Sequence, residues 1–252
     1  MSVFKKVRMP YVTTMVQAKT AEAVFCKIRN AVADGTEAVG LQLEMLEGTD
    51  RTEETIFRCM EAAEGKPLYV TNYRTHENAD RSDEDLMNEL IAYLKCGALL
   101  LDMMGDAFSP APEELTMDPK VVGLQRKFID EVHARGGQIL MSSHIYTWRS
   151  PERVLEIAHA QECRGADIVK IVTGADTEEE ELSNFGICRL LQKELKTPFL
   201  FLSCGKCGKL HRLIGPALGA CMWLCVREYD AFTTEIQPVL ANVLKVKSAL
   251  KL

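Results

Sequence analysis

Short apolar runs alternate with longer amphipathic segments along the entire chain. Eight runs of six or seven residues are rich in valine, isoleucine, leucine or aromatic residues, and most are followed by polar or glycine-containing turns. Buried parallel strands have this appearance. We therefore predict strands at Tyr11–Val16, Ala38–Glu44, Leu68–Tyr73, Ala98–Met104, Gln138–His144, Ile168–Thr173, Phe199–Cys204 and Cys221–Val226.

The segments between these runs have the periodicity of amphipathic helices. Several begin with residues that favour a helix N-terminus, such as Ser82, Asp118-Pro119 and Ser150-Pro151. We predict helices at Ala21–Ala33, Thr52–Ala63, Asp83–Cys96, Asp118–Arg135, Pro151–Arg164 and Thr177–Leu195, and a closing helix at Thr234–Leu252.

The alternation of strands and helices indicates the fold class. Successive strands begin about 30 residues apart for most of the chain, the length of one strand–helix unit. Strict alternation implies a parallel sheet, either open and doubly wound or closed into a barrel. Eight strands favour the barrel, and no G-x-G-x-x-G dinucleotide-binding turn follows the first strand. We predict a single (β/α)8 barrel domain over residues 1–252.

Composition and charge argue against several classes of partner. Hydrophobic and charged contents of 47% and 26% are those of an ordinary globular protein. A net charge of −6 disfavours a nucleic-acid partner, because phosphate binding needs concentrated positive charge. No apolar run approaches the roughly 20 residues of a membrane span, and the N-terminal residues lack the apolar core of a signal peptide. We expect a cytoplasmic protein with neither nucleic-acid nor membrane partners.

The cysteines do not suggest a disulfide framework. Their number, nine, is odd, and no export signal precedes them, so we expect reduced thiols. Four lie in apolar runs, where cysteine packs as a small hydrophobic residue. These are Cys26, Cys96, Cys221 and Cys225.

The segment Cys204-x-x-Cys207, followed by His211, is a weak candidate for a zinc site. Zinc normally takes four ligands, and the local sequence lacks a second pair. We therefore expect no metal.

A lysine interrupts the apolar strand that begins at Ile168. Alternation places Ile168, Lys170 and Val172 on one face, with both faces of a barrel strand covered. Loss of hydration disfavours a charged amine, and a neutral amine is what attack on a carbonyl requires. We predict that Lys170 forms an imine with its substrate. The simpler alternative is a lysine paired with a carboxylate at the barrel end.

A histidine ends the preceding strand. His144 lies at the C-terminal end of its strand, the face of a barrel that carries active sites. It precedes Lys170 by 26 residues, about one repeat, so adjacent strands bring the two side chains together. Histidine can accept and return a proton near neutral pH. We predict that His144 is the general acid/base, and that Tyr146 and Trp148 are candidate walls of its pocket.

The residues around Lys170 resemble the type I 3-dehydroquinate dehydratases, the Schiff-base enzymes of the shikimate pathway. The resemblance rests on Met141–His144, Gly165–Ile171 and Ser203–Arg212, with a weaker match at Thr71–Thr75. It spans most of the chain. It implies a cofactor-free enzyme, commonly a homodimer, that acts on a small hydroxy-ketone.

The resemblance also implies roles for the matching residues. Lys170 forms an imine with the ring ketone of the substrate. His144 removes the proton alpha to the iminium, helps to expel the β-hydroxyl as water, and assists imine formation and hydrolysis. Arg212 matches an arginine that binds the substrate carboxylate, and Arg74 matches another arginine of the pocket.

The chain departs from the family pattern in the segment that closes the second strand. Where the family has Glu-x-Arg-x-Asp, this chain has Gly40-Leu41-Gln42-Leu43-Glu44. Glycine replaces an acid, and Gln42 replaces a cation that would face the substrate. The acid that orients the family's catalytic histidine falls at Glu77 or Asn78.

A second departure lies near the C-terminus. The family's Ser-Ala-Pro-Gly-Gln segment, which closes over the substrate, corresponds to Ala231–Glu235. Glu235 then replaces a substrate-binding amide, unless a shift of one or two residues brings Gln237 there instead.

These departures change the recognition residues but keep the lysine and the histidine. We therefore hypothesise a Schiff-base dehydratase whose ligand is a hydroxy-ketone related to 3-dehydroquinate. Three alternatives stay open: a true dehydroquinate dehydratase with an unusual pocket, a class I aldolase-type lyase, and a non-catalytic binding or regulatory protein.

Overall fold

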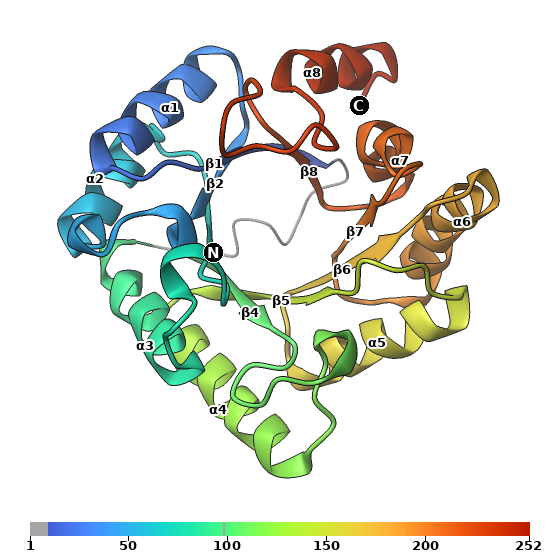
Figure 1. The fold of residues 1–252 in the computed structure, drawn as a ribbon, viewed down its shortest axis with the longest axis horizontal. Coiled ribbons are helices and arrows are strands. Elements are labelled where there is room, and N and C mark those ends of the chain that lie inside the picture. Colours follow the sequence, from blue (N-terminus) through green and yellow to red (C-terminus); the bar gives the residue numbers. More distant parts are fainter. Residues whose placement is uncertain (1–9, 98) are drawn as a thin grey trace.

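Eight parallel strands form a barrel that is surrounded by helices (Figure 1). The structure is a computed structural model, and it describes residues 10–97 and 99–252. The predicted (β/α)8 fold is confirmed. The strands are β1 (Tyr11–Val16), β2 (Ala38–Gln42), β3 (Leu68–Thr71), β4 (Leu99–Met104), β5 (Gln138–His144), β6 (Ile168–Gly174), β7 (Phe199–Cys204) and β8 (Met222–Cys225).

Each strand pairs with the next along the chain, from β1 to β7, and β1 also pairs with β8. Between β7 and β8 the Cys221 amide donates to the Phe199 carbonyl at 2.8 Å. The barrel is therefore nearly closed, and all eight strands end at the same rim.

Helices follow the strands around the outside of the barrel (Figure 1). They are α1 (Ala21–Ala33), α2 (Glu53–Ala62), α3 (Asp83–Tyr93), α4 (Pro119–Ala134), α5 (Pro151–Arg164), α6 (Glu178–Glu194), α7 (Lys209–Ile214) and α8 (Leu240–Ala249). The first six begin where a Thr, Ser or Asp side chain accepts a backbone N–H of the first turn. Within the described residues, no helix has the length and apolarity to span a bilayer.

Several predicted elements differ in extent from the structure, and one helix was not predicted. The second strand ends at Gln42, and Leu43–Met45 form a 3-10 turn that tucks Glu44 beneath the barrel rim. The closing helix, predicted at Thr234–Leu252, is only Leu240–Ala249, because the chain first runs as a loop over the rim. Helix α7 was not predicted, since it is six residues long and has no side-chain cap. Ala98 lies outside the described residues.

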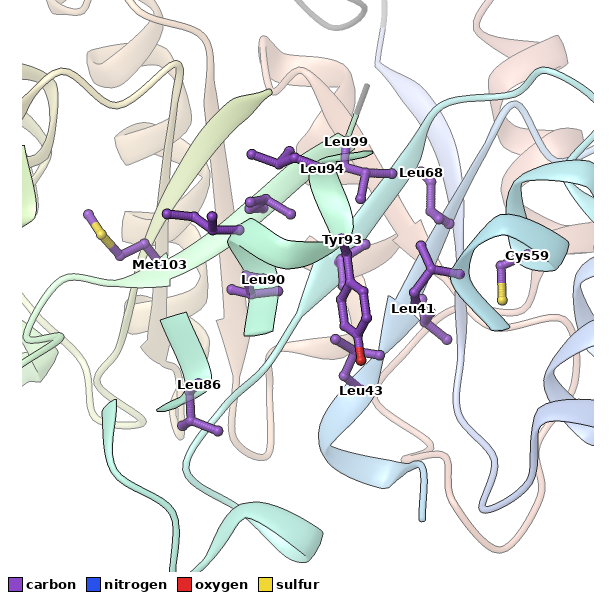
Figure 2. Close-up of a cluster of buried hydrophobic side chains, with 14 of the residues drawn as sticks. Leu41, Leu43, Cys59, Leu68, Leu86, Leu90, Tyr93, Leu94, Leu99 and Met103 are labelled. Atoms are coloured by element: carbon purple, nitrogen blue, oxygen red, sulfur yellow. The ribbon is translucent and has the colours of Figure 1, made fainter. Parts of the chain in front are cut away.

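The core has an inner and an outer layer. On β6, Ile168 and Val172 belong to the cluster inside the barrel, whereas Val169 and Ile171 pack against α5 and α6. Figure 2 shows part of the outer layer, in which strand residues such as Leu41 and Leu68 meet Leu90 of α3. The predicted alternation therefore points Lys170 into the barrel.

The burial of the cysteines agrees with the prediction at two of four positions. Cys221 and Cys225 are buried in and beside β8. Cys26 is exposed and Cys96 is only half-buried, so the prediction was wrong there. Cys26 lies on α1 beside the buried stripe that includes Phe25 and Ile28, not within it.

Helix α7 is anchored by a buried histidine. The His211 ring is fully buried beside Phe185 and Phe201, and its Nε2 lies 3.3 Å from the Cys188 Sγ. Within the described residues its Nδ1 is buried without a partner. Burial, followed by the charge of Arg212, lowers the pKa of His211 to about 3. The buried ring is therefore neutral at neutral pH.

We expect His211 to make stability fall in mild acid. Its pKa is lower in the folded than in the unfolded chain, so its contribution is complete above pH 6.5 and is lost as the pH falls toward 3. The free energy of unfolding should drop by about 2 kcal/mol between pH 7 and pH 5 from this group alone. Denaturant titrations should show this drop in the native protein and not in His211→Gln. Equal pH dependence in both proteins would contradict the assignment.

Candidate active site

A cavity of about 430 Å³ opens at the C-terminal ends of the strands. Every strand contributes a residue to its wall, among them Gln42 from β2, His144 from β5 and Lys170 from β6. The loops after β3, β5 and β8 complete the rim with Arg74, Tyr146, and a group made up of Phe232, Thr234, Ile236 and Gln237. This is the end of a barrel at which active sites are built.

The Lys170 amine is surrounded by polar groups inside the barrel. The side chain is 5% exposed, and its Nζ lies 3.0 Å from the Tyr69 hydroxyl, 2.5 Å from the Tyr73 hydroxyl and 3.1 Å from Asp102 Oδ2. Asp102 also accepts hydrogen bonds from both phenols and, at 2.5 Å, from Ser142 Oγ. We call Tyr69, Tyr73 and Asp102 the amine cage.

The cage carries a carboxylate that the sequence reasoning did not place beside the lysine. Burial raises the pKa of Asp102, but the Lys170 ammonium and the neighbouring hydrogen bonds outweigh this and hold it below its ordinary value. Burial raises the pKa of both phenols well above the ordinary value, and the Asp102 charge adds to this. The Lys170 nitrogen is thus paired with a buried carboxylate, which is the simpler alternative that the sequence analysis left open.

His144 lies beside the cage. In the sheet register it pairs with Val172, two residues beyond the Ser142–Lys170 pair, so both side chains face the same cavity. Its ring packs edge-on against Tyr73, with 5.0 Å between centroids, and stacks on Tyr146 at 6.2 Å. Tyr73 therefore lies between the amine and the imidazole.

Glu114 orients the imidazole. One of its carboxylate oxygens lies 2.7 Å from His144 Nδ1 and accepts the His144 backbone N–H at 2.6 Å. An ionised carboxylate only accepts, so Nδ1 carries the proton of a neutral ring and Nε2 carries the lone pair. The acid was predicted at Glu77 or Asn78. Glu77 is exposed, and Asn78 is a buried amide that donates to Asn72 and to the Tyr73 carbonyl.

The backbone that carries Glu114 is strained. Glu113 and Glu114 have φ of 60° and 49°, a left-handed conformation that non-glycine residues rarely adopt. The Glu113 carboxylate accepts from Arg149 at 2.5 Å and from Arg153 at 2.6 Å. Ser143 Oγ donates to the Glu114 carbonyl at 3.0 Å. These bonds hold the strained turn so that its carboxylate reaches the imidazole.

Arg212 is a buried cation that faces the cavity. It is 9% exposed, and its Nε donates to the Ser203 carbonyl at 2.6 Å. Within the described residues no carboxylate lies within ion-pair distance of its guanidinium. Burial lowers the pKa of Arg212 to about 10, so it stays charged at neutral pH. An unpaired buried guanidinium beside a cavity is a binding site for an anion.

Arg74 also lines the cavity, but its donors are already engaged. Its Nε and one Nη donate to Asp83 at 2.5 and 2.6 Å, and the other Nη donates to Asp106 at 2.8 Å. The pocket arginine implied by the resemblance is thus present, with two carboxylates neutralising it.

At the C-terminal ends of β1 and β2, the cavity wall consists of polar side chains that form hydrogen bonds with one another. The Gln17 amide donates to Gln42, which donates to Glu44 at 2.8 Å, and Thr71 donates to both Glu44 oxygens. Burial raises the pKa of Glu44, against the hydrogen bonds that it accepts. Gln42 lines the cavity as predicted, but its amide group is already hydrogen-bonded to Gln17 and Glu44.

Gly40 leaves room for a methionine. A Cβ at this position would lie 2.2 Å from the Met15 Sδ and 3.3 Å from the Tyr69 ring. Met15 itself lines the cavity. An apolar thioether therefore fills the space in which the family pattern has an acid.

The predicted site residue Glu235 is exposed and is not part of the cavity wall. Thr234, Ile236 and Gln237 do line it, so the amide of Gln237, the alternative considered from the sequence, faces the cavity. Tyr146 also forms part of the wall, whereas Trp148 does not.

The Cys204-x-x-Cys207 segment does not assemble with His211. That ring is buried against Cys188, behind the cavity. Within residues 10–97 and 99–252, no group of three or more His, Cys, Asp or Glu side chains is arranged to hold a metal.

Comparison with known proteins identifies a family through its sequence model and a fold through solved structures. The sequence model of the type I 3-dehydroquinases matches residues 12–232. A 3-dehydroquinate dehydratase of Alkaliphilus oremlandii is 29% identical over 94 residues, which span 36% of this chain and only 37% of that relative. Among solved structures, the 3-dehydroquinate dehydratases of Geobacillus kaustophilus and Enterococcus faecalis have the same fold.

The Geobacillus structure has a TM-score of 0.81 at 17% identity and covers 97% of this chain and 92% of its own. The Enterococcus structure has a TM-score of 0.75 at 22% identity and covers 98% and 99%. At these identities the structures show the fold alone. The family model covers most of the chain, and the chain therefore belongs to the type I 3-dehydroquinase family.

Proposed function

We propose that this protein is a Schiff-base dehydratase that acts on 3-dehydroquinate or a related cyclic hydroxy-ketone with one carboxylate. The observation that carries the proposal is the Lys170 amine, held inside the barrel at the base of a cavity that has an unpaired arginine in its wall. Membership of a hydro-lyase family supports the same reaction.

In this proposal Arg212 binds the carboxylate of the substrate and so places the ring ketone at Lys170. Charge-assisted hydrogen bonds to a buried guanidinium are strong, because little water competes with them. The ketone and the Lys170 amine form an imine. Its positive charge lies beside Asp102, which already holds the ammonium at 3.1 Å.

The iminium then acts as an electron sink for the next step. His144 Nε2 removes a proton from the carbon alpha to the iminium, while Nδ1 stays bonded to Glu114 at 2.7 Å. The electron pair expels the β-hydroxyl, which leaves as water after the imidazolium returns the proton. Hydrolysis of the conjugated imine releases the product and restores the lysine.

The polar residues of the wall already bond one another. This favours a ligand that makes fewer hydroxyl contacts with the protein than a ligand of the family pattern would make. Gln42 and Glu44 bond one another, Arg74 is neutralised by Asp83, and Met15 fills the space above Gly40. A hydroxyl placed against this wall would have to displace existing bonds. We therefore propose that 3-dehydroquinate and its less hydroxylated analogues be compared as substrates.

We expect borohydride to fix a covalent adduct on Lys170 when the protein is incubated with 3-dehydroquinate or a less hydroxylated cyclic keto acid. Peptide mapping by mass spectrometry locates the modified residue. The matched control is the double variant Lys170→Met/Asp102→Asn, because removing the lysine alone leaves a buried unpaired charge. Absence of an adduct with every ketone favours a non-catalytic binding protein, and a product from carbon–carbon cleavage favours an aldolase.

Replacing Arg212 should weaken substrate binding more than it slows the chemistry. Arg212→Gln is expected to raise KM by roughly 10- to 100-fold, the worth of about one charge-assisted hydrogen bond. Lys209→Gln removes a charge from the same helix at an exposed position, so steady-state kinetics should show it nearly unchanged. Similar KM values for both variants would show that the carboxylate binds elsewhere.

Replacing Glu114 should slow turnover and spare the first covalent step. Glu114→Gln keeps the shape of the side chain but removes the charge that orients His144, so kcat is expected to fall by roughly 10- to 100-fold with little change in KM. The borohydride adduct on Lys170 should still form to the level of the native protein. Undiminished kcat would show that the imidazole needs no carboxylate partner.

A further inference from the structure

Tyr73 lies between Lys170 and the cavity, where a group that transfers protons between the amine and a substrate would have to lie. Three side chains of the described residues bond the Lys170 Nζ: Tyr69, Tyr73 and Asp102. Tyr69 and Asp102 are buried and do not line the cavity, whereas Tyr73 does. Tyr73 is therefore the one partner of the amine that also reaches the space in which the ketone must lie.

Imine formation requires two proton transfers from nitrogen to oxygen. An ammonium and a ketone become an iminium and water, so the positive charge is conserved. Two of the three ammonium protons leave with the carbonyl oxygen, and one stays on the nitrogen. The first transfer accompanies attack on the carbonyl carbon and gives a carbinolamine that is still protonated on nitrogen. The second accompanies cleavage of its carbon–oxygen bond, which releases water.

We propose that the Tyr73 hydroxyl carries both of these protons. In each transfer the phenol oxygen accepts a proton from the Lys170 nitrogen, 2.5 Å away, while its own proton passes to the oxygen of the former carbonyl. The phenol is neutral before and after each transfer. The inference rests on the proposed function, since it describes how the imine on Lys170 forms and, in reverse, how it is hydrolysed.

The surroundings of Tyr73 fit this role. In the resting site its hydroxyl lies 2.5 Å from Asp102 Oδ2, so its proton points to the carboxylate until a carbonyl oxygen arrives. Burial and the nearby Asp102 charge raise its pKa, and the phenol is therefore not held as a phenolate. His144 packs against the Tyr73 ring and is not among the partners of the amine. The imidazole is thus left to act on the carbon skeleton.

Tyr69 provides a matched control. Its hydroxyl also bonds Lys170, at 3.0 Å, and Asp102, but it is fully buried beneath the cavity. Tyr69→Phe and Tyr73→Phe each remove one phenol from the cage. A role limited to holding the ammonium predicts similar losses for the two variants, whereas proton transfer to the substrate predicts a much larger loss for Tyr73→Phe.

The test measures imine formation alone. The probe is 3-oxocyclohexane-1-carboxylate, which carries a ketone and a carboxylate but no β-hydroxyl, so the reaction stops at the imine. Rapid mixing, a borohydride quench and intact-protein mass spectrometry give the rate of adduct formation. We expect Tyr73→Phe to slow this rate at least about tenfold more than Tyr69→Phe does. Exchange of the ketone oxygen with ¹⁸O-labelled water should slow in parallel.

Each outcome has a separate meaning. Equal rates in the native protein and Tyr73→Phe, or equal losses in both variants, overturn the proton-carrier role and leave the Schiff-base function standing. No adduct in the native protein, with this probe or with 3-dehydroquinate, overturns the Schiff-base function itself. If Tyr73→Phe does not fold, difluorotyrosine incorporated at position 73 keeps the shape and makes the phenol more acidic. An unchanged rate of imine formation in that protein also contradicts the role.

Discussion

The ion pair between Lys170 and Asp102 is the constraint on which the site depends. Two opposite charges lie 3.1 Å apart in the barrel interior, where an unpaired charge would be strongly destabilising. Tyr69, Tyr73 and Ser142 satisfy the remaining hydrogen-bonding capacity of the pair. The site can therefore keep the lysine nitrogen away from water without leaving either of these two charges unpaired.

This pairing also sets a limit on the chemistry that is possible there. Asp102 stabilises a cation at the lysine nitrogen, whether that cation is an ammonium or an iminium. It does not favour a neutral amine, so deprotonation must be coupled to attack on the ketone. A hydrogen-bonded group that touches both the nitrogen and the cavity can provide that coupling, and this is the position of Tyr73.

Much of the fold and part of the site follow from the sequence. The spacing of apolar runs gives the eight strands, and alternation on β6 gives the inward direction of Lys170. The same rule would have found Asp102, which interrupts the apolar strand β4 as Lys170 interrupts β6. Glu114 could not be found this way, because two consecutive left-handed residues carry it to His144. Local sequence patterns do not reveal such turns.

The hydrogen bonds and ion pairs among the wall residues could not be predicted from the sequence either. Arg74 and Gln42 stand at pocket positions, yet whether a donor is free depends on partners such as Asp83 and Glu44 that approach in three dimensions. Arg212 shows the opposite case: it was inferred by resemblance, and the structure leaves its charge without a carboxylate partner within the described residues. The distinction matters for recognition, because only an unsatisfied group gains free energy from a ligand. Under the proposed function the cavity thus offers Arg212 as an anchor for an anion and Lys170 as the amine, beside wall residues such as Arg74 and Gln42 that already bond other side chains.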